Sequence, residues 1–263
     1  MFILGTANFG NVYQGSTRVI NIQNAYNLVQ EFIRLGGQQL DTADAYGDAK
    51  NILQKLHILN FTVGTKIDSK KLLSVEEITK YVKNIGKQFE KKLNYILLHD
   101  SQFLKDAQNE SIKFFQNYLR EHNIKLGISI YNQYELDEAL NRFEQISLVQ
   151  APLNYLDRRF VSDNFLELCS INHIDVNYRS IFLQGKLLHK YDLLHPFFQK
   201  FNEIKSYHAD FSISPFKSLL EFNIEFIKSI TDFSKVTLGV ETILQLQEIH
   251  SILNCNGDAA EEH

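Results

Sequence analysis

The fold is indicated most directly by the stretch Tyr95-Ile96-Leu97-Leu98-His99, an apolar run that ends in a polar residue. A continuous apolar run, in contrast to an alternating one, is typical of a strand that is buried on both faces. Strands of this kind belong to parallel sheets, in which helices cover both faces. We therefore expect helices on both sides of this stretch and a β/α alternation along the chain.

The rest of the chain alternates between helical and strand patterns in both directions from this stretch. Residues 75–89 place apolar side chains on one helical face, and a helix at 112–121 leads to a strand at 125–130. A helix predicted from Phe160 to Asn172 leads to a strand at 175–178. The segment 61–66 is rich in residues that favour strands. Eight strands are predicted, each followed by a helix. They begin near residues 2, 38, 61, 94, 125, 147, 175 and 236.

Eight β/α units in a chain of 263 residues are typical of a closed barrel, whose sites lie at the carboxyl ends of the strands. The competing fold is a doubly wound open sheet, but Gly5 and Gly10 do not form the glycine-rich turn that such sheets use for dinucleotides. We predict an α/β fold, a single-domain (β/α)8 TIM barrel over residues 1–255. Residues 256–263 are small and acidic, and we expect them to form a flexible tail.

Composition narrows the classes of partner. With 27 basic and 31 acidic residues the net charge is -4, which gives no electrostatic surface for nucleic acid. No segment has the length and apolarity of a signal peptide or a membrane span, so we expect a cytoplasmic protein without membrane contact. The two cysteines, Cys169 and Cys255, belong to no metal-binding or disulfide pattern. A small-molecule partner is therefore favoured, and no metal is predicted.

Polar side chains follow three consecutive predicted strands. In Leu40-Asp41-Thr42-Ala43-Asp44-Ala45-Tyr46-Gly47, Asp41 ends the second strand and Tyr46 lies just beyond it. Lys66 ends the third strand and His99 the fourth. Each residue alone also fits a structural role, as a helix cap, a packing aromatic, a solvated strand end or a core imidazole. Because neighbouring strand ends meet at one barrel mouth, the set of four predicts a catalytic site.

This set has the chemistry to reduce a carbonyl group. A lysine cation beside a tyrosine favours the phenolate, and Asp41 can hold Lys66 charged, so Tyr46 is the expected proton donor near neutral pH. His99 can hydrogen-bond a substrate carbonyl oxygen and polarise it toward hydride attack. No metal is required for these roles.

In order and in strand context, Asp41, Tyr46, Lys66 and His99 resemble the catalytic tetrad of the aldo-keto reductase family. The strings around them resemble that family's signatures, and the similarity runs from the first predicted strand to the last helix. The resemblance implies a (β/α)8 barrel that transfers hydride from NADP or NAD to an aldehyde or ketone. It also implies that Tyr46 supplies the proton.

The resemblance further implies a set of cofactor contacts. Ser129 and Gln150 would bind the nicotinamide carboxamide, while Gly239 and Gln245, with Glu248, would hold the adenosine phosphate side. A helix N-terminus at that place suits a phosphate, because its free N–H groups and its dipole favour an anion. The expected cofactor-binding residues are Ser129, Gln150, Arg179, Ser180, Gly239, Glu241 and Gln245.

Two positions depart from the family pattern. Arg179 stands where many members carry a tyrosine that stacks on the nicotinamide, and its guanidinium can stack or can pair with an anion. An ordinary ion pair at the barrel rim is the structural alternative. Together with Arg158 and Arg159, Arg179 leaves open an anionic or sugar-like carbonyl substrate. Glu241 stands where NADP-preferring members carry a basic residue, so the cofactor is NAD, or NADP held through other residues.

Two functions of different classes remain at this stage. The first is a nicotinamide-dependent carbonyl reductase with Tyr46 as proton donor. The second is a catalytically slow or inactive nicotinamide-binding barrel that acts as a sensor or scaffold, which Glu241 and the short loops would suit. A lyase or isomerase is weaker, because it has no use for cofactor contacts at Ser129 and Gln150.

Overall fold

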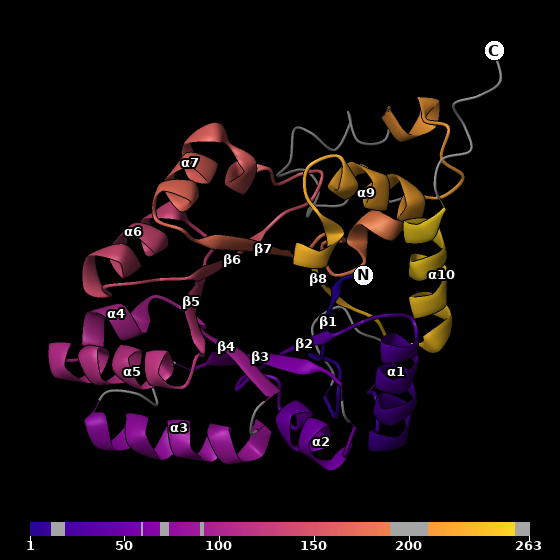
Figure 1. Cartoon of the computed structure of the whole chain (residues 1–263). Coiled ribbons are helices and arrows are strands. Elements are labelled where there is room, and N and C mark those ends of the chain that lie inside the picture. The colour runs from indigo at the N-terminus through magenta and orange to yellow at the C-terminus, as the bar shows by residue number, and fades with distance from the viewer. Residues whose placement is uncertain (12–18, 59, 69–73, 90–91, 190–209, 256–263) are drawn as a thin grey trace.

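The computed structural model describes residues 1–11, 19–58, 60–68, 74–89, 92–189 and 210–255. Eight parallel strands form one sheet in the order β7-β6-β5-β4-β3-β2-β1-β8, which curls into a ring with helices around it (Figure 1). An isolated parallel bridge between Tyr178 and Val236 brings the two ends of the sheet together. The predicted (β/α)8 barrel is confirmed. Among the described residues, no helix is long and apolar enough to cross a membrane.

The elements alternate along the chain as the sequence patterns predict. The strands are β1 Ile3–Gly5, β2 Gln39–Ala43, β3 Thr62–Ile67, β4 Leu93–Leu98, β5 Lys125–Ser129, β6 Leu148–Pro152, β7 Asp175–Arg179 and β8 Thr237–Gly239. The helices are α1 Ile22–Arg34, α2 Ala49–Lys55, α3 Val75–Phe89, α4 Gln102–Asp106, α5 Asn109–Glu121, α6 Gln133–Arg142, α7 Asp163–Ile171, α9 Leu219–Lys228 and α10 Ile243–Asn254. Short 3-10 helices lie at Arg159–Val161, Lys186–Leu188 and Phe233–Lys235.

Helix α1 shows how local sequence sets the bounds of these elements. The Asn21 side chain caps its start by accepting a hydrogen bond from the Asn24 N–H, a contact worth about 1 kcal/mol. Leu28 and Phe32 are buried on one face. The helix ends before Gly36, whose φ of +88° is a backbone conformation that glycine adopts at little cost. The chain can therefore turn directly into β2.

The structure differs from the predicted elements in three places. The helix predicted from Phe160 to Asn172 is interrupted, because Phe160 has non-helical angles and Ser162 is extended, so α7 begins at Asp163. Helix α4 is additional. Strand β2 continues to Ala43, which pairs with Lys66, and Asp41 therefore lies inside the strand and not at its end. The predicted tail, 256–263, and residues 190–209 lie outside the described residues.

Side chains fill the interior of the barrel below its carboxyl mouth. Tyr95, Leu97 and Leu148 form a buried cluster there. Gly127 makes room for it, since a Cβ at this position would lie 2.6 Å from Leu97 Cδ2 and 2.2 Å from the Leu148 carbonyl oxygen. The barrel is thus a packed core, which leaves the carboxyl ends of the strands to form the site.

Candidate active site

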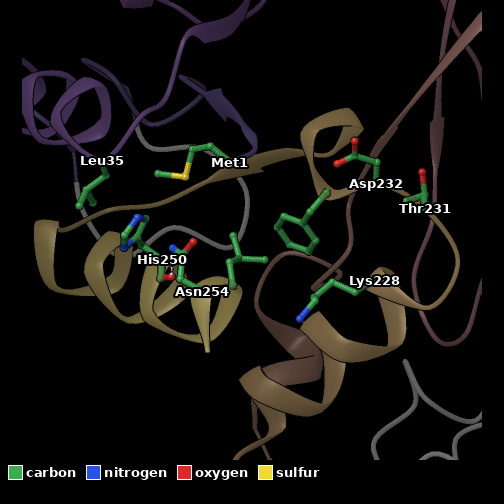
Figure 2. A pocket seen from close by; sticks show the side chains of 9 residues that line it. Met1, Leu35, Lys228, Thr231, Asp232, His250 and Asn254 are labelled. Carbon is green, nitrogen blue, oxygen red and sulfur yellow. Dashed lines mark hydrogen bonds between the residues drawn. The ribbon is translucent and has the colours of Figure 1, made fainter. Parts of the chain in front are cut away.

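A cavity of about 910 Å³ lies at the carboxyl ends of the strands. All residues that the sequence singled out for catalysis or cofactor binding line it. They are Asp41, Tyr46, Lys66, His99, Ser129, Gln150, Arg179, Ser180, Gly239, Glu241 and Gln245. A smaller hollow of about 360 Å³, shown in Figure 2, lies near the amino ends of β1 and β8 and contains Met1 and Asp232. It contains none of the predicted site residues.

A buried ion pair between Lys66 and Asp41 is the centre of the cavity floor. The side chains are 2% and 1% exposed, and Lys66 Nζ donates to Asp41 Oδ1. The other carboxylate oxygen, Oδ2, accepts hydrogen bonds from Tyr95 Oη at 2.8 Å and Gln150 Nε2 at 3.2 Å. Burial lowers the pKa of Lys66 most strongly, but Asp41 and Tyr46 outweigh it and raise the pKa overall. Lys66 is therefore a cation and not a solvated strand end.

Tyr46 lies in direct contact with the Lys66 ammonium group. Lys66 Nζ donates to Tyr46 Oη at 3.4 Å and lies 5.3 Å from the ring centroid. Because the ammonium is the donor, the contact stabilises negative charge on the phenol oxygen. That is the charge which proton donation by Tyr46 would produce.

The loop that carries Tyr46 is fixed from outside the barrel. Asp44 forms an ion pair with Lys50 of α2. Its carboxylate also accepts from Tyr81 Oη of α3 at 3.3 Å and from the Asp68 N–H at 3.2 Å. These contacts tie the loop to two helices and to the segment after β3.

His99 faces the same space. Its ring lies 6.4 Å from that of Tyr46, at 86° to it. Burial, and then the charge of Lys66, lower the pKa of His99 below its ordinary value of 6.5. The imidazole is therefore neutral at neutral pH, and its ring N–H can donate to a carbonyl oxygen without adding a second cation.

Gln150 and Ser129 fit a nicotinamide carboxamide. Gln150 is fully buried, and its Nε2 donates to Asp41 Oδ2 and to Thr237 Oγ1, each at 3.2 Å. Its Oε1 has no hydrogen-bond partner among the described residues. A buried acceptor without a donor costs about 1–3 kcal/mol, and a carboxamide N–H would satisfy it. Ser129, on the neighbouring strand, lines the same wall.

Arg179 lies across this wall at the end of β7. Its guanidinium lies over the Tyr131 ring, with 4.2 Å between Cζ and the ring centroid. It donates to the Ile130 carbonyl oxygen at 3.1 Å, to Ser129 Oγ at 3.4 Å and to Ser180 Oγ at 3.4 Å. Within the described part of the chain it forms no ion pair, in contrast to the rim ion pair considered above.

The adjoining wall, beyond the end of the neighbouring strand β8, contains the start of helix α10. Thr242 caps the helix by accepting from the Gln245 N–H, and Gln245 Oε1 accepts from the Glu241 N–H at 2.8 Å. The Asn8 amide donates to Glu241 Oε1 at 3.3 Å. Gln245 thus has a capping role that its predicted cofactor contact did not include. The helix N-terminus beside Gly239 is suited to an anion.

Comparison with known proteins decides the family. The model of the aldo/keto reductase family matches residues 2–255. The chain belongs to this family. As an aldo-keto reductase it is an NAD(P)H-dependent oxidoreductase that reduces carbonyl compounds. The alternative of a sensor or scaffold has no support in the comparisons.

Solved structures share the fold of this aldo-keto reductase. An aldo-keto reductase from Bacillus halodurans, in its holo form, has a TM-score of 0.76 at 19% identity, covering 97% of this chain and 87% of its own. The glycerol dehydrogenase from Gluconobacter oxydans has a TM-score of 0.70 at 16% identity, covering 95% and 85%. A variant of the protein Gox0644 in complex with NADPH has a TM-score of 0.68 at 12% identity, covering 96% and 83%. A search of curated proteins found no match.

The structure adds residues to the site that the sequence reasoning missed. Tyr95 and Thr237 bond to members of the site, and Tyr131 supports Arg179. Tyr95 could have been found, because it lies on β4 four positions before His99, which directly follows that strand, and alternate residues share a face. Tyr131 lies after β5, and no residue spacing in the sequence indicates its contact with Arg179.

Proposed function

We propose that Tyr46 is the proton donor of this aldo-keto reductase, with Lys66 and Asp41 supporting it and His99 orienting the carbonyl group. The observation that carries this assignment is the position of Lys66 Nζ, which contacts both Asp41 Oδ1 and Tyr46 Oη inside a buried floor. The cation stabilises the phenolate, and the carboxylate keeps the cation charged.

Carbonyl reduction needs a hydride at the carbonyl carbon and a proton at the carbonyl oxygen. The nicotinamide, when bound, supplies the hydride, which forms a bond to the carbonyl carbon. The carbonyl π electrons move to oxygen, and the proton of Tyr46 Oη passes to that oxygen to give the alcohol. His99 donates a hydrogen bond to the same oxygen and so favours the developing charge. The Tyr46 phenolate remains beside Lys66 until solvent returns a proton.

Replacement of Tyr46 by phenylalanine tests the assignment. Loss of the general acid should lower carbonyl reduction by about 10²–10⁴-fold, while the affinity for the reduced cofactor, measured by its fluorescence, stays close to that of the parent protein. Tyr26→Phe, on the outer side of α1 and 41% exposed, is the matched control. A Tyr46→Phe protein that reduces aldehydes at the parent rate would exclude Tyr46 as the donor.

We infer a preference for NAD over NADP. Glu241 lies at the start of α10, where its carboxylate would repel a 2′-phosphate and accept from a 2′-hydroxyl. Glu241→Gln should therefore tighten the binding of NADPH relative to NADH in fluorescence titrations. If both cofactors keep their parent affinities in this variant, the carboxylate does not set the preference.

We also infer that the carbonyl substrate is anionic, including sugar-like compounds that carry a carboxylate or phosphate. Arg179 supports this, because its guanidinium borders the cavity and forms no ion pair among the described residues. An α-keto acid and its neutral amide form a matched pair for the test. The acid should show the lower KM, and Arg179→Gln should remove the difference; equal KM values in the parent protein would refute the inference.

A further inference from the structure

We propose that Tyr95 is a positioning residue for the proton-donor system: its phenol holds the Asp41 carboxylate in the orientation in which Oδ1 faces Lys66. Tyr95 is 1% exposed and lies below the cavity, where it cannot contact substrate. Its Oη donates to Asp41 Oδ2 at 2.8 Å. This inference rests on the roles proposed above for Asp41, Lys66 and Tyr46.

The register of three adjacent strands places Tyr95 within reach of Asp41. Asp41 on β2 pairs with Gly64 on β3, and Gly64 pairs with Tyr95 on β4. Two strand spacings amount to about 9–10 Å, so the two side chains can meet only if the residue between them leaves the space open. Gly64 does so, because a Cβ there would lie 1.8 Å from Tyr95 Cζ. The hydrogen bond between Tyr95 and Asp41 therefore depends on glycine at position 64.

The hydrogen bonds to Asp41 show how Tyr95 fixes the orientation of the carboxylate. Oδ1 accepts from Lys66, and Oδ2 accepts from Tyr95 and, at the longer distance of 3.2 Å, from Gln150. With donors on both oxygens the carboxylate cannot rotate about its Cβ–Cγ bond without breaking contacts. Tyr95 supplies the shorter of the two contacts on Oδ2. Lys66 Nζ thereby keeps its position below Tyr46.

Tyr95 can serve as donor throughout the working pH range. Burial, and then the charge of Asp41, raise the pKa of its phenol well above the ordinary value, so the hydroxyl stays protonated. The titratable groups around Asp41 are Lys66 of β3, Tyr46 of the loop after β2 and His99 at the end of β4. Of these groups Lys66 donates to Oδ1, whereas Tyr95 donates to Oδ2.

The experiment compares two phenylalanine variants, each of which removes one buried hydroxyl. Tyr95→Phe keeps the ring over Gly64 and loses the hydrogen bond of the hydroxyl to Asp41. The control is Tyr178→Phe, because Tyr178 is 3% exposed and its Oη donates to the Phe160 carbonyl oxygen, outside the cavity. Steady-state kinetics with one aldehyde would give kcat and KM, and crystal structures of the parent and both variants would give the Asp41 and Lys66 side-chain positions.

Tyr95→Phe should lower kcat by about 10-fold, the effect expected when a hydrogen bond to a charged group is lost, and should leave KM for the aldehyde within about 2-fold. Its crystal structure should show the Asp41 carboxylate rotated and Lys66 Nζ displaced from Tyr46. Tyr178→Phe should match the parent in both measurements. An unchanged kcat, or an equal loss in both variants, would overturn the proposal.

Failure of the proposed function gives a different result. If the parent protein reduces no aldehyde in a broad panel, the proposed catalytic roles of Tyr46 and His99 are refuted. The crystal structures still test whether Tyr95 orients the Asp41 carboxylate. Asp41 and Lys66 side chains that superimpose on the parent in Tyr95→Phe would then overturn the inference by themselves.

Discussion

Replacement of Lys66 by methionine separates the structural cost of the buried ion pair from its catalytic effect. Methionine has a similar length but no charge, so the variant leaves the Asp41 carboxylate, 1% exposed, without its cation. Removing one partner of a buried pair typically costs about 3–5 kcal/mol. Because Tyr95 and Gln150 still donate to Asp41, we expect the lower end, about 3 kcal/mol.

Urea unfolding measures this cost, with an unchanged m-value as the check that the unfolded state is comparable. For a chain of this size, about 3 kcal/mol corresponds to a fall in Tm of roughly 6–12 °C. Adding Asp41→Asn to Lys66→Met removes the uncompensated charge and should recover most of the loss. The matched control is Lys125→Met, since Lys125 pairs with Asp175 at the surface and should contribute less than about 1 kcal/mol.

Two results would refute this reasoning. The first is a Lys66→Met protein that unfolds within about 1 kcal/mol of the parent protein, which would mean that the carboxylate is not an uncompensated charge. The second is a double variant as unstable as Lys66→Met alone, which would show that the loss comes from packing. In either case, carbonyl reduction by Lys66→Met should still fall, because Tyr46 loses its cation.

The remaining predictions concern Gly64 and His99. Gly64→Ala places a methyl group 1.8 Å from Tyr95 Cζ and should lower the unfolding free energy by about 1–3 kcal/mol, whereas the same change in a Tyr95→Leu background should cost much less in thermal melts. The pKa of His99 is lowered in the folded protein, so its contribution to stability is complete above pH 6.5 and is lost as the pH falls below 6.5. Between pH 7.5 and pH 5.5 the parent protein should therefore lose more unfolding free energy than His99→Gln does; equal losses in the two proteins would contradict this.

The barrel could be predicted from sequence because each β/α unit carries its own local signal. Apolar runs such as 95–99 and helical stripes such as 75–89 need no knowledge of distant contacts, and parallel strands in sequence order follow from the alternation. The interruption at Phe160 was missed because a buried aromatic residue satisfies the helical pattern whether or not its backbone is helical. Only the observed angles distinguish the two cases.

The candidate site was predictable to the extent that it depends on strand ends. Lys66 and His99 could be placed at one mouth from their positions alone, without any distance. The bond between Tyr95 and Asp41 could not, because it depends on the register of β2, β3 and β4 and on the space over Gly64. The cap formed by Gln245 depends likewise on the local geometry of α10.

The anchoring of Asp44 to Lys50 and Tyr81 has a consequence for engineering new specificity into this enzyme. Tyr46, the proposed proton donor, stands on a loop fixed from outside the barrel, while another side of the cavity is lined by residues 180–186, 188 and 189, which follow β7. Variant libraries restricted to the cavity-lining positions 182–186, 188 and 189 should therefore reshape the space available to a substrate while leaving Tyr46 in place. A screen of such libraries should yield altered selectivity far more often than lost turnover.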